Sequence, residues 1–104
     1  MFGWFRRPEG RKSLIEEFED LLGETQKSRA ARSEEIRWEG MTVPQWVPYE
    51  LETLLRAING KRSERGLAPC SMGDLLRVEK RALGHSDYTH KMALYARNLV
   101  EGEM

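Results

Sequence analysis

The chain has 104 residues, of which 39% are hydrophobic and 33% are charged. This length allows one compact domain with a modest core and excludes a second independent domain. Seventeen basic and seventeen acidic residues cancel to a net charge of zero. This balance excludes the overall positive field typical of nucleic-acid binders, so any such role needs a local patch.

Targeting signals and disulfides are not indicated. No run approaches the roughly 18 consecutive apolar residues of a membrane span, and residues 1–12 lack the apolar stretch of a secretory signal. The single cysteine, Cys70, excludes an intramolecular disulfide and a cysteine-based zinc site. We therefore expect a soluble cytoplasmic protein that is stabilised by packing, with no metal and no cofactor.

The first predicted element after an aromatic and basic tail (residues 1–12) is an amphipathic helix. Ser13 and Glu16 form a capping-box pattern, which predicts a helix that starts at Leu14. The apolar positions of this helix recur every three or four residues, at Leu14, Ile15, Phe18, Leu21 and Leu22. Residues 24–37 keep good helix formers but offer little to bury, so they either continue the helix as a solvated arm or fray. The segment 13–37 is thus an amphipathic helix with a polar extension, which either packs on the C-terminal unit or projects from it.

The amino-acid composition changes in the middle of the chain. Residues 38–48 are rich in tryptophan and proline and are broken by Gly40 and Pro44, which predicts a structured linker without regular helix. Pro48 suits a helix start and Asn59-Gly60 a helix stop, so a helix is expected over about 48–59.

Two further helices are expected over about 72–83 and 88–101. Ser71 and Asp74 form a weaker capping pair before the first, Gly84 ends it, and Ser86 or Asp87 caps the second. The fold class is thus all-α: a compact three-helix unit (residues 38–104) that follows the amphipathic helix and the connector. The predicted core of this unit is Val47, Leu51, Leu54, Leu55, Ile58, Leu75, Leu76, Leu83, Met92, Tyr95 and Leu99.

A basic patch over residues 56–81 is the main electrostatic feature. The candidate phosphate-binding residues are Lys61, Arg62, Arg65, Arg77, Lys80 and Arg81. A solvated surface explains such a charge run better. A helix-turn-helix that uses residues 88–91 to contact base edges is disfavoured, because His85 and His90 fall where that motif is usually apolar.

Enzymatic chemistry finds little support. His85 and His90 lie five residues apart, which does not suit two metal ligands on one helix, and no base is identifiable beside Cys70. We find no phosphate-binding glycine loop and no nucleophile elbow. The sequence therefore predicts a protein that is not an enzyme and has no catalytic residue.

Recognition of a partner is the leading hypothesis, because the amphipathic and aromatic surface exceeds what one small core needs. We expect a non-enzymatic interaction or regulatory module that docks on a protein partner, or on itself as a homodimer. The expected contact residues are Leu14, Phe18, Leu21, Leu22, Trp4 and Trp38. Nucleic-acid binding through the basic patch is the alternative, and attachment to a membrane surface through residues 2–7 is the third reading.

Overall fold

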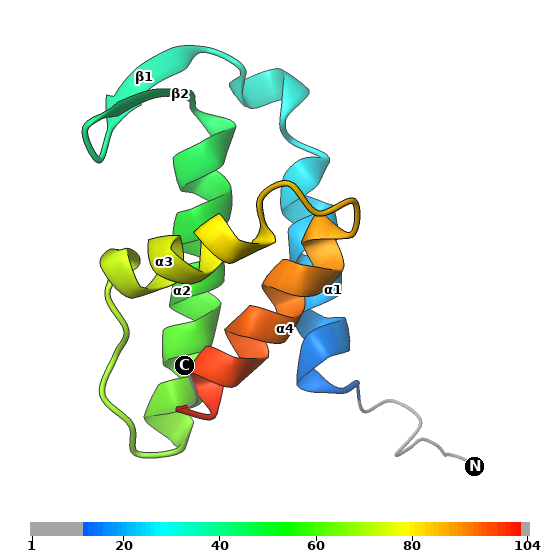
Figure 1. Cartoon of the computed structure of the whole chain (residues 1–104), viewed down its shortest axis with the longest axis vertical. Helices are drawn as coiled ribbons and strands as arrows, with labels where there is room; N and C mark the ends of the chain where they lie inside the picture. Colours follow the sequence, from blue (N-terminus) through cyan, green and yellow to red (C-terminus); the bar gives the residue numbers. More distant parts are fainter. Residues whose placement is uncertain (1–11, 103–104) are drawn as a thin grey trace.

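The computed structural model describes residues 12–102, so Trp4 and nearly all of the N-terminal tail lie outside the described residues. Four α-helices make up most of this part of the chain (Figure 1). They are α1 (Leu14–Gln26), α2 (Trp46–Glu64), α3 (Met72–Ala82) and α4 (Tyr88–Val100). Between α1 and α2 lie a single 3-10 turn, η2 (Ala30–Arg32), and the strands β1 (Glu35–Trp38) and β2 (Met41–Pro44).

Local capping fixes where α1 and α3 begin. The Ser13 hydroxyl accepts a hydrogen bond from the Glu16 amide at 3.2 Å, and the Glu16 carboxylate accepts one from the Ser13 amide at 3.0 Å. Ser71 and Asp74 form the same reciprocal pair at 3.1 and 3.0 Å. Both predicted starts are confirmed, because each pair satisfies two backbone donors that a helix N-terminus leaves free.

Helix α2 is longer than predicted and passes through Asn59-Gly60. The Asn59 side chain does not end the helix, because it binds both backbone groups of Cys70, at 3.0 Å to the carbonyl and 2.7 Å to the amide. It thereby fastens the loop between α2 and α3 to the middle of α2. A side chain that looked like a stop signal instead serves a tertiary contact.

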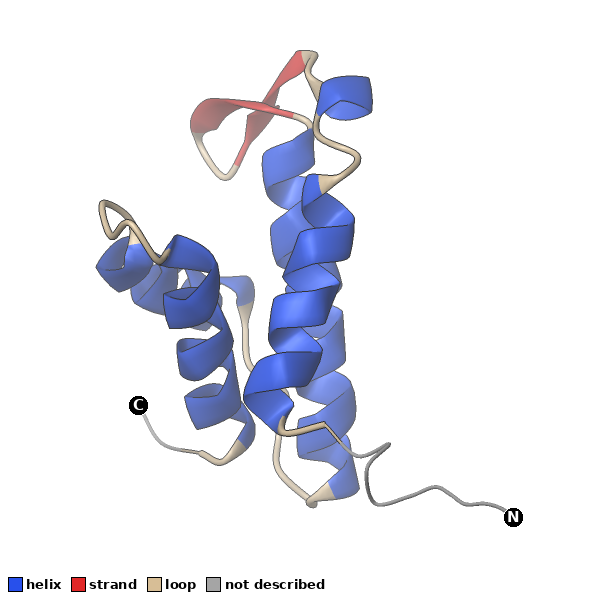
Figure 2. Cartoon of the chain, turned by 90° about the vertical axis from the view of Figure 1, so that its right-hand side faces the viewer, coloured by secondary structure: helices blue, strands red, loops and turns tan. Residues whose placement is uncertain are grey.

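Helix α1 belongs to the same bundle as the other helices. It packs most extensively on α4 and next on α2, and its Phe18 and Leu22 are 1% and 2% exposed (Figure 2). Burial of each such side chain is worth about 1.5–3 kcal/mol. Of the two expected alternatives, α1 therefore packs on the other helices and does not project as an arm. Within residues 12–102 four helices form the bundle, so a separate three-helix unit over residues 38–104 is not fully confirmed.

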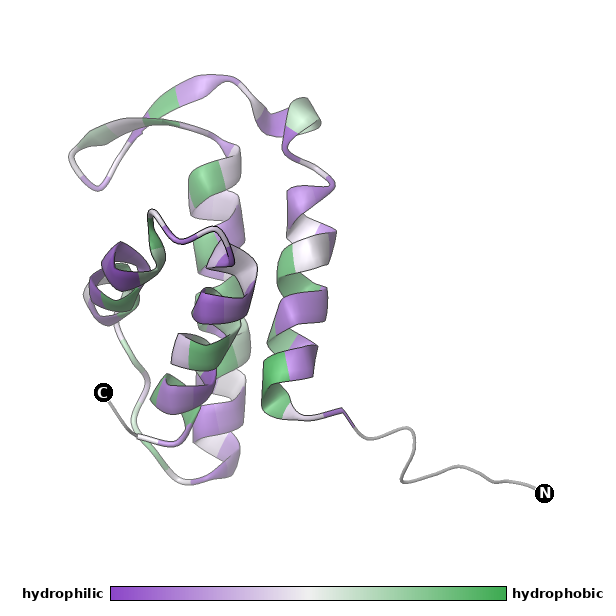
Figure 3. Cartoon of the chain, turned by 45° about the vertical axis from the view of Figure 1, so that its right-hand side comes forward, coloured by the Kyte–Doolittle hydropathy of each residue, from purple (hydrophilic) through white to green (hydrophobic). Residues whose placement is uncertain are grey.

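The core follows the inward faces of all four helices (Figure 3). Six predicted core residues are buried: Leu51, Leu54, Ile58, Leu75, Met92 and Leu99. Val47, Leu55, Leu76 and Tyr95 are half-buried against them. Leu83 is a wrong prediction, because it follows the last turn of α3 in extended backbone and is 56% exposed. The other buried hydrophobic residues of α3 and α4, outside the predicted core list, are Val78, Ala82, Ala93, Ala96 and Val100.

A β-hairpin over residues 35–44 occupies the end of the expected polar extension and most of the expected irregular connector, so the described chain is mostly helical with a small two-stranded sheet. Ile36 pairs with Val43 and Trp38 with Met41 in antiparallel register. Glu39 and Gly40 form the two-residue turn with φ of 51° and 75°, the left-handed backbone that tight hairpin turns require. Along β1 exposed and half-buried residues alternate, as a strand with one covered face requires.

Candidate functional site

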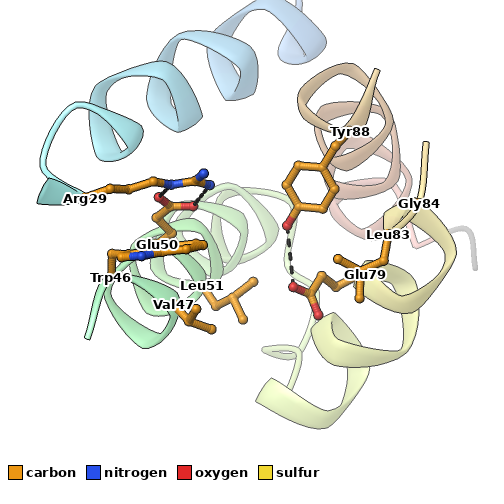
Figure 4. Close-up of a pocket in the computed structure, with 9 residues that line it drawn as sticks. All are labelled: Arg29, Trp46, Val47, Glu50, Leu51, Glu79, Leu83, Gly84 and Tyr88. Atoms are coloured by element: carbon orange, nitrogen blue, oxygen red, sulfur yellow. Dashed lines mark hydrogen bonds and ion pairs between the residues drawn. The ribbon is translucent and has the colours of Figure 1, made fainter. Parts of the chain in front are cut away.

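A cleft of about 360 Å³ opens where α2 begins, α3 ends and α4 begins (Figure 4). The turn between α1 and η2 contributes one residue, Arg29, to its wall. The cleft is lined by Arg29, Trp46, Val47, Glu50, Leu51, Glu79, Leu83, Gly84 and Tyr88. Its size lies at the small end of the range for ligand-binding pockets, about 300–1,000 Å³.

One wall is built around a buried carboxylate. Glu50 is 4% exposed, and the Arg29 guanidinium donates to its two oxygens at 2.6 and 2.9 Å. The same guanidinium lies 3.9 Å from the centre of the Trp46 ring, and Arg32 lies 3.8 Å from that of Tyr49. Hydrogen bonding to Glu50 raises the pKa of Arg29. The second stacked pair lies three residues after the first in both segments. The two pairs together thus hold the turn against the start of α2.

The opposite wall carries a second, differently placed carboxylate. The Tyr88 hydroxyl donates to Glu79 at 3.4 Å, across the cleft from Trp46, Val47 and Leu51 (Figure 4). Burial raises the pKa of Glu79. Burial and the neighbouring Glu79 also raise the pKa of Tyr88, which keeps the phenol protonated as a donor. Among residues 12–102, Glu79 forms no ion pair.

A second hollow of about 390 Å³ adjoins the first on the side of the hairpin. It lies between the hairpin tip and α3, and Glu79 and Leu83 line both hollows. Its other lining residues are Glu39, Met41, Gly73, Leu76, Arg77 and Lys80. We call the two hollows together the α3 groove. In Figure 1 α3 crosses α2, and the hairpin tip lies on the same side of α2 as the first turns of α3.

Exposed apolar surface is concentrated in the α3 groove. In the described part of the chain the exposed large hydrophobic residues are Leu83 (56%), Met41 (41%) and Leu67 (37%). The first two line the groove, whereas Leu67 lies in the loop between α2 and α3. A protein of this size buries most such side chains, so two that share one concave surface indicate a place for contact.

The expected contact residues on α1 are largely occupied by the bundle itself. Phe18 and Leu22 are buried, which corrects their assignment as docking residues. Leu14 and Leu21 are half-buried against the core. Trp38 is half-buried on β1 and also packs on the core. Trp4 lies outside the described residues.

The predicted basic patch is divided among structural contacts. Lys61 pairs with Glu17 of α1 at 2.9 Å. Arg62 donates to the carbonyls of Ala68, at 2.7 Å, and Leu99, which ties the loop after α2 to the end of α4. Arg65 donates to the Lys61 carbonyl at 3.3 Å. Arg77 pairs with Asp74 of its own helix, and Lys80 and Arg81 are exposed.

The first turn of α4 faces other helices of the same chain. Thr89 accepts a hydrogen bond from Gln26 at 3.0 Å, and His90 lies 2.8 Å from Glu19. Tyr88 faces Glu79, as described above. Residues 88–91 are therefore largely engaged with α1 and α3, which leaves little of this turn for contacts to base edges.

Cys70 is half-buried, and burial raises the pKa of its thiol. A raised pKa disfavours the thiolate that nucleophilic or metal chemistry requires. Within residues 12–102 no group of three histidine, cysteine or carboxylate residues is placed to hold a metal ion. In the same range no helix is long and apolar enough to cross a bilayer.

Sequence reasoning missed the cleft. In the sequence Arg29 lies in the polar extension of the first helix, Glu79 and Tyr88 lie in separate predicted helices, and the prediction of a helix over 48–59 does not single out Glu50. One sequence signal for Glu50 is that it directly precedes Leu51, a residue of the apolar stripe. The sequence near Glu50 does not indicate that its partner is Arg29. No family model, curated protein or solved structure matches this chain, so the argument for function depends on the fold and this site.

Proposed function

We propose that this protein is a non-enzymatic interaction module that docks a partner protein in the α3 groove. The observation that carries the proposal is Leu83, a large apolar residue that is 56% exposed at the boundary of two adjoining hollows. Binding energy in protein interfaces concentrates where an anchor side chain fills a hollow surrounded by polar groups.

The groove has the parts such an interface needs. Leu83 and Met41 supply apolar contact, Val47 and Leu51 line the first hollow, and polar or charged side chains surround both hollows. The docking surface of this proposal is thus the hairpin and α3, and α1 serves to complete the bundle. Trp38 is the strand partner of Met41 but lines neither hollow.

The competing functions have less support from the geometry. Nucleic-acid binding through the basic patch would require Lys61, Arg62 and Arg77 to leave contacts within the chain. Attachment to a membrane surface would depend on residues 2–7, which lie outside the described residues. A homodimer that uses the α3 groove is a special case of the proposal in which the partner is a second copy.

Capture from a lysate of the source cells, followed by mass spectrometry, tests the proposal. The full chain, Leu83→Ser and Leu67→Ser are compared, because both leucines are exposed and only Leu83 lines the groove. We expect a captured protein that is lost with Leu83→Ser and kept with Leu67→Ser. Equal capture by all three proteins contradicts docking in the groove.

Two solution measurements separate the alternatives. Light scattering detects a homodimer, which Leu83→Ser should dissociate if the groove forms the interface. An anisotropy titration with a nucleic acid at two salt concentrations detects phosphate binding, which weakens steeply with salt. Nucleic-acid binding that is unaffected by Leu83→Ser would overturn the proposal.

A further inference from the structure

The two hollows of the α3 groove differ in charge. The first contains one cation, Arg29, and two carboxylates, Glu50 and Glu79. Because Arg29 is held by Glu50 on two hydrogen bonds, the charge that remains is the negative one on Glu79. The second hollow adds the cations Arg77 and Lys80 and the carboxylate Glu39. A partner side chain thus meets a negative group in the first hollow and a mixed rim in the second.

Glu79 has capacity for another contact. A carboxylate has about four acceptor sites on its two oxygens, and the only side-chain hydrogen bond to Glu79 within the described range comes from Tyr88, to Oε2. Figure 4 shows the second oxygen of this carboxylate directed away from Tyr88. Since the site is half-buried, a cation placed there is screened less than one in open water.

Apart from the Arg29–Glu50 pair, most of the side chains that line the first hollow with Glu79 are apolar or aromatic. Val47 and Leu51 lie on one side and Leu83 on the other, with the Trp46 ring at the edge. A group that contacts these apolar side chains and Glu79 together therefore needs a hydrocarbon stem as well as a positive charge. Lysine and arginine side chains have this construction, an alkyl stem that ends in a cation.

We propose that the first hollow binds a cationic side chain, lysine or arginine, of the docked partner, with Glu79 as its counter-ion and Val47, Leu51 and Leu83 against its alkyl stem. This inference rests on the proposed docking function and names the chemistry of the partner. We assign the cation to a protein because Leu83 and Glu79 line both hollows, so that one extended peptide can occupy the two hollows together. A peptide that crosses Leu83 places its cation in the first hollow and a neighbouring apolar side chain against Met41 and Leu76 in the second.

The experiment is a nuclear magnetic resonance titration of the full ¹⁵N-labelled chain. The probe is the peptide N-acetyl-Leu-Ala-Lys-amide, and its control replaces lysine with norleucine, which keeps the stem and removes the charge. Shifts are followed at the backbone amides of Leu83 and Gly84 and at the indole of Trp46. We expect the lysine peptide to bind about tenfold more tightly, as a charged hydrogen bond provides.

Variants assign the preference to one residue. Glu79→Gln keeps the shape of the side chain and should bring the two peptides to equal affinity. Glu64→Gln, an exposed carboxylate at the far end of α2, should leave the tenfold preference intact. Equal affinity of the two peptides for the unmodified chain, no shift in the cleft, or a preference that survives Glu79→Gln would each overturn the inference.

A third probe, n-butylamine, distinguishes a partner's side chain from a free amine. Binding as tight as that of the lysine peptide would overturn the assignment to a protein partner. Failure of this inference is also distinguishable from failure of the docking proposal. If Leu83→Ser abolishes partner capture and Glu79→Gln leaves both capture and peptide affinity unchanged, docking stands and recognition of a cation is wrong.

Discussion

Removal of Arg29 should cost far more stability than its surface position suggests. Loss of one partner from a buried ion pair costs about 3–5 kcal/mol, because the other charge is left buried without compensation. The Glu50 side chain is 5% exposed, whereas that of Arg29 is 36% exposed, so water replaces part of what the guanidinium provides. We therefore expect Arg29→Met to lower the free energy of unfolding by about 3 kcal/mol, the lower end of that range.

The reverse change should be milder. Glu50→Met leaves a guanidinium that is one-third exposed and still stacked over Trp46. We expect a cost of about 1 kcal/mol for this variant and a similar cost for the double variant, since an ion pair replaced by apolar side chains is often nearly neutral. The control is Arg32→Met, which removes a stacked arginine without a buried carboxylate and should cost about 0.5–1 kcal/mol.

Urea unfolding at pH 7, followed by circular dichroism, measures all four variants on one scale. Additive costs for Arg29→Met and Glu50→Met would refute the reasoning, because additivity means that the two side chains do not depend on each other. A cost of Arg29→Met no larger than that of Arg32→Met would refute it as well. Either result would mean that Glu50 is hydrated in solution.

Three more predictions follow from the fold. Phe18→Ala should cost about 3–5 kcal/mol because it empties a fully buried position on α1, whereas the half-buried Leu21→Ala should cost clearly less in the same urea assay. Glu79→Gln should stabilise the protein at pH 7 and have no effect well below pH 4. Burial raises the pKa of Glu79 in the folded state. The protonated form therefore contributes stability that is present below the unfolded pKa of about 4.3 and is lost as pH rises through the folded pKa. Thermal unfolding at the two pH values checks this sign. Gly40→Ala should cost about 1–2 kcal/mol, since its φ of 75° is unfavourable for a residue with a Cβ atom, and thermal unfolding measures it.

The parts of the fold that sequence could predict are those set by neighbours along the chain. Ser13 with Glu16, and Ser71 with Asp74, determine helix starts through hydrogen bonds between residues three positions apart, and both starts are confirmed. The helical class and most of the core of α2 to α4 follow from apolar spacing in the same way. These signals are local, so no tertiary information is needed to interpret them.

The hairpin and the position of α1 depend on contacts that spacing does not reveal. Ile36 and Trp38 alternate with exposed residues, but two half-buried positions are too few to override a helix-forming composition in the preceding segment. An apolar stripe such as that of Phe18 and Leu22 predicts burial without naming the surface that buries it. Here that surface is mainly α4, at the opposite end of the sequence.

The candidate site could not be predicted for the same reason. Its two carboxylates, Glu50 and Glu79, become distinct only in three dimensions, because one is neutralised by Arg29 and the other is not. In sequence each is an ordinary acidic residue on a helix. Within the described part of the chain the fold gives Glu50 a cationic partner and gives Glu79 none, and this difference leaves the Glu79 carboxylate able to bind a ligand.

The packing of α1 on α4 also sets the order in which this molecule can mature during translation. Phe18 and Leu22 are synthesised before α4, the helix on which α1 packs most, so the nascent chain displays an uncovered apolar surface until residues 88–100 have left the ribosome. Premature termination before residue 88 would release a product with that surface uncovered, and such a product should be a preferred substrate for chaperones and quality-control proteases.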